Sequence, residues 1–439
     1  MAKIAMKFAI HPSRLRPACK RDGWMAKIAM KFGGTSVADL DRIRHVATLV
    51  KSERDRGNEV AVVVSAMAGE TNKLIGWTNE AAKGPGANAI QIPDARELDV
   101  VMAAGEQITA GLLAVALGAL GVPARSWLGW QIPIRTSSVH GHARIEGVDP
   151  ELMNESLSRG EVAVVAGYQG VAAHDRISTL GRGGSDTSAV AVAAGLRADR
   201  CDIYTDVDGV YTTDPRIVPK ARRLEKVAYE EMLEMASLGA KVLQTRSVEI
   251  AMLHRVPTRV LSTFAPDAGG TLLCDEEDIV EKKPVTGIAY SRDEAKITLH
   301  KIPDRPGIAA AIFGPLADSG VNVDMIVQNV SEDGRKTDLT FTVTRGELAA
   351  ALAACEKAGP AIGYRDITSD ANVAKVSIVG IGMRAHPGVA QTMFRTLSEK
   401  GINIQVISTS EIKVSVLISE EYVELALRAL HSAYELDAA

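Results

Sequence analysis

The stretch TLGRGGSDTSAVAVAAGL, residues Thr179–Leu196, decides how the rest of the chain is interpreted. Gly181, Gly183 and Gly184 permit positive φ angles and let the backbone approach a ligand closely. The polar residues 185–187 suit a helix N-terminus, and the small apolar residues after them predict a buried helix. A loop that turns into a helix presents unpaired N–H groups and a partial positive charge to anions.

Two charged side chains extend what this loop can bind. The guanidinium of Arg182 can hold a carboxylate or phosphate in a bidentate fork. The carboxylate of Asp186 can hold an ammonium group. One loop therefore offers both halves of a binding site for an amino acid. A tight turn followed by an ordinary capped helix is the alternative, and the loop alone does not decide between them.

The composition is that of a globular protein with several domains. The chain has 439 residues, 46% of them hydrophobic and 24% charged, with a net charge of −4. The charge excludes a basic footprint, so we expect no nucleic-acid partner. The four cysteines lack metal-ligand spacing and form no disulfide framework, which indicates a reducing cytoplasm. The longest apolar run, Thr109–Val122, is too short to span a bilayer and predicts a core helix, with no membrane partner.

The N-terminus contains a duplication. The octapeptide MAKIAMKF occupies residues 1–8 and recurs at residues 25–32. The segment between the two copies is basic and irregular, without the apolar core of a signal peptide. We expect Met25 to be the natural start, and residues 1–24 to be an artefact or disordered. A genuine N-terminal tail is the alternative.

Buried strands alternate with helical patterns after Met25. This alternation predicts an α/β domain whose mainly parallel sheet is sandwiched by helices. Ligands of such sheets bind beyond the carboxyl ends of the strands, where KFGGTS, SAMAGET, LGRGGSD and TDVDGVYTTDPR all fall. A purely structural domain has no need of four such loops at one edge. The expected strands are 26–32, 59–65, 161–167 and 202–205, and the expected first helix is 39–56.

Several side chains in these loops suit phosphate or substrate. Lys31 ends the first strand beside Gly33 and Gly34, so its ammonium would stand over a phosphate cradle; a solvated lysine is the alternative. The hydroxyls of Ser65 and Thr71 could donate to phosphate or substrate, although each is a weak signal alone.

Further candidates come from acidic and basic residues. Glu106 lies inside an otherwise apolar helix, and because an unpaired buried carboxylate is costly, we expect it to have a cationic partner. Lys241, in GAKVLQTRS at an expected helix start, could be a second phosphate-binding lysine. The pattern TDVDGVYTTDPR is typical of a nucleotide edge and lacks EF-hand spacing. Its candidates are Thr205, Asp206, Asp208, Tyr211, Asp214 and Arg216.

Two nucleotide-binding motifs can be excluded. The chain has no G-x-x-x-x-G-K-[ST], so it is not a P-loop enzyme. Residues 380–385 match G-x-G-x-x-A, but Gln405 stands in the region where a dinucleotide site needs an acid. Only 59 residues follow Gly380, too few for a full dinucleotide-binding domain.

The C-terminal third contains an internal repeat. Residues 295–326 and 374–407 each show a strand, a loop ending in Pro-Gly, a helix and a Gly-[Val/Ile]-Asn-[Val/Ile] turn into a second strand. A third strand follows in each copy, at 337–344 and 412–417. The repeat predicts two small modules of mixed α and β structure.

The motifs in order resemble those of the aspartate kinase family. They are KFGGTSV, VVVSAMAGETN, AGEQIT, TLGRGGSDTSA, YTDVDGVYTTDPR and GAKVL, followed by the two Pro-Gly modules. The resemblance runs from Met25 nearly to the end and implies an amino-acid kinase fold followed by tandem ACT domains of ferredoxin-like α+β type. It implies an N-terminal extension at 1–24, a catalytic domain at 25–274, and a regulatory region at 275–439, with ACT domains at approximately 285–365 and 370–439.

The resemblance also implies an activity. Members use ATP with magnesium to convert L-aspartate to 4-phospho-L-aspartate, the first step toward lysine, threonine and methionine, in the cytoplasm. The implied catalytic residues are Lys31, Asp206 and Lys241. The implied aspartate-binding residues are Ser65, Thr71, Glu106, Arg182, Gly183, Gly184, Ser185 and Asp186. The implied nucleotide-binding residues are Lys31, Phe32, Gly33, Gly34, Ser65, Ser185, Thr205, Asp206, Tyr211, Asp214, Arg216 and Lys241. No protein ligand to a metal is assigned.

The ACT pair implies feedback inhibition by lysine, threonine or both, and a homo-oligomer formed through these domains. In some relatives the C-terminal half is also made separately. Another amino-acid kinase, for glutamate or carbamate, and a non-catalytic amino-acid sensor remain alternatives. The tandem ACT pair and the Arg182/Asp186 loop favour aspartate over the former, and Lys31 and Lys241 argue against the latter. The implied effector-binding residues are Asp304, Gly307, Asn322, Asp324, Gln328, Asn329, His386, Gly388, Val389, Asn403, Ile404, Ser410 and Glu411.

Overall fold

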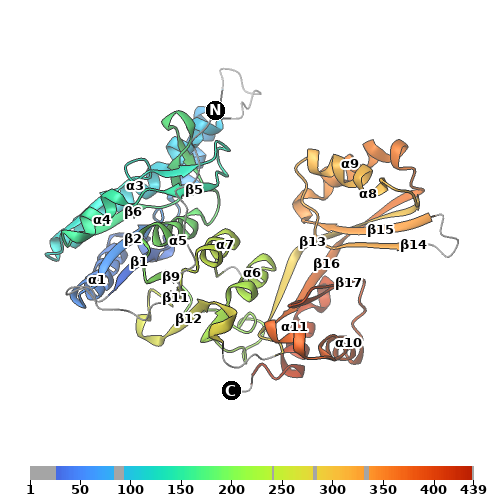
Figure 1. Cartoon of the computed structure of the whole chain (residues 1–439). Helices are drawn as coiled ribbons and strands as arrows, with labels where there is room; N and C mark the ends of the chain where they lie inside the picture. The colour runs from blue at the N-terminus through green and yellow to red at the C-terminus, as the bar shows by residue number, and fades with distance from the viewer. Residues whose placement is uncertain (1–25, 84–92, 240–241, 280–283, 331–335, 438–439) are drawn as a thin grey trace. The chain divides into compact units, whose positions relative to one another are not determined.

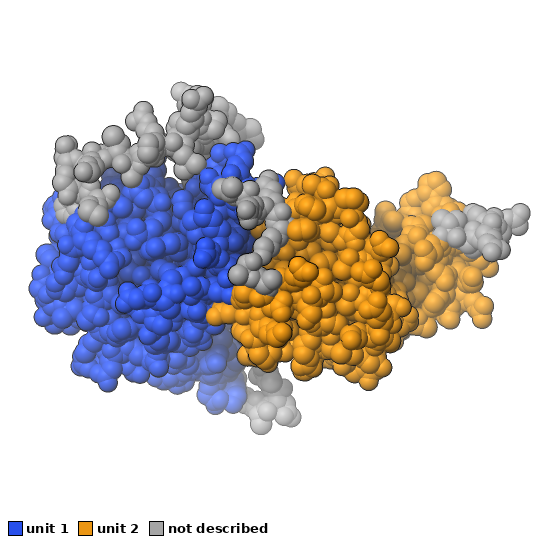
Figure 2. Space-filling model, turned by 90° about the horizontal axis from the view of Figure 1, so that it is seen from below, with its two compact units in different colours: residues 1–210, 223–229, 241–279 blue, residues 211–222, 230–240, 280–439 orange. Residues whose placement is uncertain are grey.

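The chain forms two compact units, which Figure 2 colours separately. The first comprises residues 1–210, 223–229 and 241–279, and the second comprises residues 211–222, 230–240 and 280–439. The computed structural model describes residues 26–83, 93–239, 242–279, 284–330 and 336–437. The predicted N-terminal extension, residues 1–24, lies outside the described residues.

An eight-stranded sheet forms the centre of the first unit (Figure 1). Its strand order is β10-β12-β11-β9-β1-β2-β6-β3, and every neighbouring pair is parallel except β11 and β12. The mainly parallel α/β sheet predicted from the sequence is confirmed. The strands are β1 (Lys27–Phe32), β2 (Glu59–Val64), β3 (Ala124–Trp127), β6 (Val162–Ala166), β9 (Arg200–Thr205), β10 (Lys226–Ala228), β11 (Thr258–Ser262) and β12 (Gly270–Cys274).

A second, four-stranded sheet in this unit was not predicted. Its order is β5-β4-β7-β8, and its strands are β4 (Ile134–Thr136), β5 (Ile145–Val148), β7 (Gln169–Val171) and β8 (Ile177–Thr179). β8 leads directly into the glycine-rich loop before α5. The helices of the unit are α1 (Leu40–Asp55), α2 (Glu70–Ala81), α3 (Ala95–Ala119), α4 (Glu151–Ser158), α5 (Gly184–Leu196) and α7 (Thr245–His254).

The alternation of side chains along β1 sets which face each residue occupies. Ile28, Met30 and Phe32 join one core cluster with residues of α1 and α3. Because successive side chains of a strand point to opposite faces, Lys31 points to the other face, where α5 packs against β1. Strand pleating therefore directs the lysine at the end of β1 toward the start of α5.

Helix α3 is longer than the sequence pattern predicted. It spans 25 residues, whereas the predicted apolar run began only at Thr109. Its length, and a mean hydropathy of 1.7 over its most apolar 18 residues, would suffice to cross a membrane, but the core helices of many proteins also meet both criteria. Leu113 and Leu117 are fully buried in the core cluster shared with α1, which supports the predicted core helix.

One six-stranded antiparallel sheet runs through the second unit, in the order β14-β15-β13-β16-β18-β17. The long strands β13 and β16 are common to both sequence repeats, because residues 287–291 pair with 375–379 and residues 296–300 pair with 366–370. Two α+β modules are present, as predicted. The elements are β13 (Gly287–Pro303), α8 (Ile308–Asp318), β14 (Ile326–Val330), β15 (Lys336–Val343), α9 (Leu348–Ile362), β16 (Asp366–Val379), α10 (Val389–Glu399), β17 (Val406–Thr409), β18 (Lys413–Ser419) and α11 (Val423–Ala433).

Two segments from the middle of the chain also belong to the second unit. They are residues 211–222 and residues 230–240, which include most of α6 (Tyr229–Ser237). The Ile288 N–H donates to the Thr212 carbonyl at 2.7 Å. The Glu231 carboxylate accepts from the Thr286 hydroxyl at 2.6 Å and from the Ile381 N–H at 3.0 Å. Hydrogen bonds therefore tie both segments to the second unit.

Candidate active site

The glycine-rich loop ends at a helix whose first turn is buried. Helix α5 begins at Gly184, and Gly183 is its N-cap with φ 69°. Residues 185–187 lie in the first turn of this helix, as predicted, but no side chain caps it. The backbone satisfies the turn instead, since the Gly184 N–H donates to the Gly181 carbonyl at 2.9 Å. A Cβ on Gly183 would lie 1.7 Å from Cγ of Gln244, so a side chain has no room there.

Lys31 and Asp186 form a buried ion pair at the carboxyl end of β1. The Lys31 ammonium lies 2.5 Å from Oδ1 of Asp186, and each residue is only 8% exposed. A Cβ on Gly33 would lie 3.2 Å from this ammonium, so the glycine leaves space for it. Lys31 is therefore not a solvated lysine, and the Asp186 carboxylate, expected to hold the ammonium of an amino acid, pairs with Lys31 in this structure.

Glu106 is a buried carboxylate with one free oxygen. Its Oε1 accepts from the Ala66 N–H at 3.1 Å, and its Oε2 is buried without a partner in the described part of the chain. Burial raises the pKa of Glu106 to about 7, and the Ala66 hydrogen bond opposes that rise. The predicted cationic partner is absent among the described residues. An ammonium group brought by a ligand would satisfy Oε2.

The remaining substrate candidates follow the same sheet edge. Arg182 is exposed and has no partner among the residues that the structure describes. Ser65 follows β2 and is half-buried, with its N–H donating to the Phe32 carbonyl at 3.1 Å. Thr71 is half-buried in the first turn of α2. A Cβ on Gly167, just after β6, would lie 2.9 Å from Oγ of Ser185. The loops after β1, β2 and β6 thus lie around the start of α5.

Sequence reasoning missed Tyr168, which lies in the same region. It has φ 67°, a strained angle for a residue other than glycine. Its N–H donates to Oγ of Ser188 at 3.1 Å, and its carbonyl accepts from the Leu180 N–H at 2.9 Å. Burial raises the pKa of the Tyr168 phenol, and the charge of Glu106 adds to the rise. The one available signal was a bulky residue between a buried strand and the loop, in GYQG.

The nucleotide candidates are divided between the two units. In the first, Thr205 ends β9 and its hydroxyl donates to exposed Asp206 at 3.1 Å. In the second, the Asp214 carboxylate accepts from Arg216 at 2.7 Å, and this hydrogen bond holds the pKa of Asp214 below its ordinary value. Tyr211 is half-buried, and Asp208 forms an ion pair with Arg223 at 3.0 Å in the first unit. Lys241, predicted as a second phosphate-binding lysine, lies outside the described residues.

A cavity of about 380 Å³ lies at the start of α8 in the first repeat. Asp304, Gly307 and Gln328 all line it. Gln328 lies on β14, which brings it to the same cavity as the loop before α8. The other candidates of this module are placed as follows: Asn322 donates its N–H to Glu347 at 3.3 Å, Asp324 forms an ion pair with Lys375, and exposed Asn329 lies on β14.

The corresponding residues of the second repeat lie around α10 and β17. Gly388 is the N-cap of α10 with φ 96°, and the Val389 carbonyl accepts from the Tyr434 hydroxyl at 2.7 Å. His386 Nδ1 lies 2.7 Å from the Gly382 carbonyl. The remaining candidates are placed as follows: Asn403 and Ile404 precede β17, the Ser410 N–H donates to the Lys413 carbonyl at 2.8 Å, and Glu411 pairs with Arg384 at 3.1 Å.

Family models match both units of this architecture. Residues 26–262 match the amino acid kinase family, and residues 298–359 and 376–434 each match an ACT domain. The fold and its loops thus define an amino acid kinase followed by two ACT domains.

Comparison with sequence relatives shows which kind of amino acid kinase this chain is. An aspartate kinase of Pseudomonas putida is 54% identical over 94% of this chain and 98% of its own length. An aspartokinase of Pseudomonas aeruginosa is 55% identical over 94% of this chain and 98% of its own length. The chain therefore belongs to the aspartate kinases, amino acid kinases that carry C-terminal ACT domains, and it is an enzyme with kinase activity.

Solved structures of Escherichia coli aspartokinase III share the fold. The complex with aspartate and ADP, described as the R-state, matches with a TM-score of 0.78 at 27% identity, covering 93% of this chain and 99% of that one. The complex with lysine and aspartate, described as the T-state, matches with a TM-score of 0.73 at 28% identity over the same shares. As a kinase of this family, the enzyme uses a nucleotide.

Proposed function

We propose that the enzyme transfers the terminal phosphoryl group of ATP to the side-chain carboxylate of L-aspartate, forming 4-phospho-L-aspartate. One observation carries the proposal: Oε2 of Glu106 is buried at the ligand-binding edge of the sheet and has no partner among the described residues. A buried carboxylate without a cation is costly, and the ammonium of an amino-acid substrate would provide that cation. The aspartate bound to the Escherichia coli neighbour supports this substrate.

The proposed substrate contacts follow from charge. The guanidinium of Arg182, which is exposed and has no partner in the described part of the chain, binds the α-carboxylate of aspartate, and Glu106 binds the ammonium. The reacting carboxylate is already ionised near neutral pH, so the reaction needs no general base. Phosphoryl transfer then depends on positioning and on neutralising charge, which Lys31 and the N-terminus of α5 supply. Ser65, Thr71 and Ser185 line the substrate in this proposal.

ATP lies beside the glycines at the end of β1 in this proposal. Gly33 and Gly34 let the backbone approach the phosphates, and Lys31 neutralises them. Asp206 is also assigned to catalysis, and Lys241 to the phosphates. The described residues hold no group of three or more His, Cys, Asp or Glu side chains that could bind a metal. In this proposal Mg²⁺ comes with the ATP phosphates and keeps several waters, as it commonly does. The other proposed nucleotide residues are Phe32, Thr205, Tyr211, Asp214 and Arg216.

We propose that the ACT domains bind lysine and threonine as feedback effectors. The cavity lined by Asp304, Gly307 and Gln328 supports an amino-acid site, because the start of α8 favours a carboxylate. The lysine complex of the Escherichia coli neighbour supports lysine as one effector. Residues 25–274 would then be catalytic and residues 275–439 regulatory. In this proposal the enzyme is a cytoplasmic homo-oligomer that carries out the first step of lysine, threonine and methionine synthesis. It could also assemble with a separately made C-terminal subunit.

An acyl-phosphate assay tests the proposal. The full chain is incubated with ATP, magnesium and hydroxylamine, and the hydroxamate is measured with aspartate or glutamate as substrate. Arg182→Ala should raise the KM for aspartate strongly, because the α-carboxylate is bound alike in ground and transition states. Arg176→Ala, which removes a half-buried guanidinium paired with exposed Glu97, is the control. Preference for glutamate, or an unchanged KM in Arg182→Ala, would contradict the assignment.

A further inference from the structure

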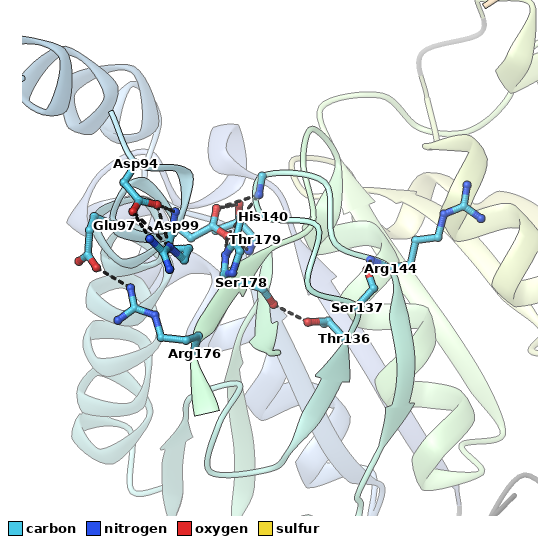
Figure 3. A network of polar contacts seen from close by, with 12 residues as sticks. Asp94, Glu97, Asp99, Thr136, Ser137, His140, Arg144, Arg176, Ser178 and Thr179 are labelled. Atoms are coloured by element: carbon cyan, nitrogen blue, oxygen red, sulfur yellow. Dashed lines mark hydrogen bonds and ion pairs between the residues drawn. The ribbon is translucent and has the colours of Figure 1, made fainter. Parts of the chain in front are cut away.

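Asp99 is the most heavily hydrogen-bonded carboxylate near the substrate loop, and nothing above gives it a role. It is 1% exposed on α3. Its oxygens accept from the Thr179 N–H at 3.0 Å, the Thr179 hydroxyl at 2.5 Å, the Gly141 N–H at 3.1 Å and His140 Nδ1 at 2.7 Å. Figure 3 shows Asp99 pointing to His140 and Thr179. One side chain therefore joins α3 to two segments, 41 and 80 residues away in sequence.

These contacts restrain the chain immediately before the substrate loop. Thr179 is the last residue of β8 and stands three residues before Arg182. The Thr179 carbonyl in turn accepts from the Ala143 N–H at 2.9 Å. A Cβ on Gly181 would lie 2.8 Å from Nδ1 of His142, so the loop runs tightly against the segment that Asp99 also holds.

Helix α7 also contacts the start of this loop. Arg246 donates to the Leu180 carbonyl and to the Ala143 carbonyl, both at 2.7 Å. Asp99 and Arg246 thus restrain the same short stretch from two helices. Asp99 and Glu106 also lie seven residues apart on α3, which places them on one face of the helix. A single rigid helix therefore carries the proposed ammonium contact and the anchor of the loop that bears Arg182.

We propose that Asp99 is a positioning residue that sets the place of Arg182 for the aspartate α-carboxylate. The inference rests on the proposed function, since it requires Arg182 to bind that carboxylate. Asp99 itself touches no substrate. Its two carboxylate oxygens together accept from four donors, whereas an amide of equal size accepts through one oxygen alone, because its nitrogen donates and cannot accept. Loss of a hydrogen bond to a charged group costs enough to let the loop relax.

Kinetics of Asp99→Asn in the full chain provide the first test. The KM for aspartate should rise roughly 10-fold or more, while the KM for ATP and kcat change less than about 3-fold. Thr179→Ser keeps both donors and should stay close to wild type, whereas Thr179→Val loses one donor and should give an intermediate KM. Glu97→Gln is the matched control, because it makes the same chemical change on the same helix at an exposed ion pair with Arg176. Equal losses in all three constants would overturn the proposal.

A double-mutant cycle tests the route through Arg182. If Asp99 acts by placing Arg182, then adding Asp99→Asn to Arg182→Ala should raise the KM for aspartate little further. Additive effects would overturn the proposal. Hydrogen exchange of residues 177–184 gives a readout that does not depend on substrate: it should become faster in Asp99→Asn and not in Glu97→Gln. If exchange becomes faster in Asp99→Asn but Arg182→Ala leaves the KM for aspartate unchanged, the proposed function is contradicted. If exchange in Asp99→Asn is unchanged, this inference alone is contradicted.

Discussion

Glu106 places a carboxylate where its charge favours binding and disfavours folding. Its pKa near 7 exceeds the ordinary value of 4.5, and burial is the main cause. The native state therefore binds more protons than the unfolded state between these two values. The contribution of protonated Glu106 to the free energy of unfolding is fully present below about pH 4.5 and is lost as the pH rises through about 7. The loss is on the order of 3 kcal/mol.

This sign predicts that Glu106→Gln stabilises the substrate-free enzyme at high pH. The amide keeps an oxygen for the Ala66 N–H but carries no charge, so Tm should exceed that of wild type by roughly 5 °C near pH 8 and by little near pH 5. Thermal unfolding of both proteins across this range measures the difference. Glu97→Gln, at an exposed site on the same helix, should show no such trend. If both substitutions give the same pH profile, burial of Glu106 is not the cause.

The Lys31–Asp186 pair predicts a separation of stability from activity. Both side chains are buried, so Lys31→Met leaves the Asp186 carboxylate uncompensated and should destabilise the fold by about 3–5 kcal/mol. Adding Asp186→Asn removes that stranded charge and should restore much of the stability. Activity should stay low in both variants, because Lys31 also neutralises the transferred phosphoryl group in the proposed mechanism. Denaturation midpoints and kcat, measured together, check this; a double variant no more stable than the single one would refute it.

At the scale of elements, the central strands were predictable and the small ones were not. β1, β2 and β6 are buried almost throughout, so they appear in the sequence as largely apolar runs, with Lys31 as the one charge inside β1. The strands of the four-stranded sheet have only three or four residues, too few to show a periodicity. The N-cap of α5 was not predictable, because a glycine in a left-handed conformation, rather than a polar side chain, precedes the helix.

Long-range pairing explains what sequence reasoning missed in the site. The partner of Glu106 that the structure shows is a backbone N–H 40 residues away, and no local pattern encodes it. Asp99 likewise occupies an ordinary position in a helical pattern, and only the fold brings Thr179 to it. The glycine motifs and Lys31 were predictable because their chemistry is contained in a few consecutive residues.

Two glycines, Gly183 before α5 and Gly111 inside α3, are predicted to respond in opposite ways to substitution by alanine. Gly183→Ala should disturb the turn before α5, since φ 69° is strained for alanine and its Cβ would meet Gln244. We expect a higher KM for aspartate and a lower Tm. Gly111→Ala, inside α3 with open space around the added Cβ, should instead raise stability by about 0.5–1 kcal/mol. Activity assays and thermal unfolding of both variants check the contrast, and equal effects would argue that the turn does not depend on Gly183.

At the scale of the whole chain, the second unit includes parts of the sequence that precede it. The Thr212 carbonyl and the Glu231 carboxylate both accept from residues beyond 280. Removing the C-terminal region would leave these groups without their partners. A shortened chain therefore cannot show cleanly what the ACT domains do, and regulation has to be tested by substitutions in the full protein.

In each repeat, a lysine at the same position on the shared sheet contacts the turn of the other repeat. Lys375, at the start of the second repeat, pairs with Asp324 in the turn of the first and with buried Glu294 at 2.9 Å. Lys296, the equivalent lysine of the first repeat, donates to Gln405 in the turn of the second at 2.5 Å. Burial alone would lower the pKa of Lys375, but Glu294 and Asp324 outweigh it and raise that pKa. Each repeat thus holds the turn of the other, so a ligand that moves one turn would affect both.

This arrangement predicts that lysine and threonine together inhibit the full chain more than either does alone. Inhibition requires that the effectors bind an inactive arrangement more tightly than an active one, with a coupling of about 1–3 kcal/mol. Gln328→Ala, in the cavity with Asp304 and Gly307, should raise the concentration of effector for half-inhibition roughly 10-fold and leave basal kcat unchanged. Asp318→Asn, at the exposed end of α8, is the matched control and should be inhibited like wild type. The test is to measure initial rates while both effectors are titrated, separately and together. If millimolar concentrations of both leave the wild-type rate unchanged, the ACT domains serve assembly and not inhibition.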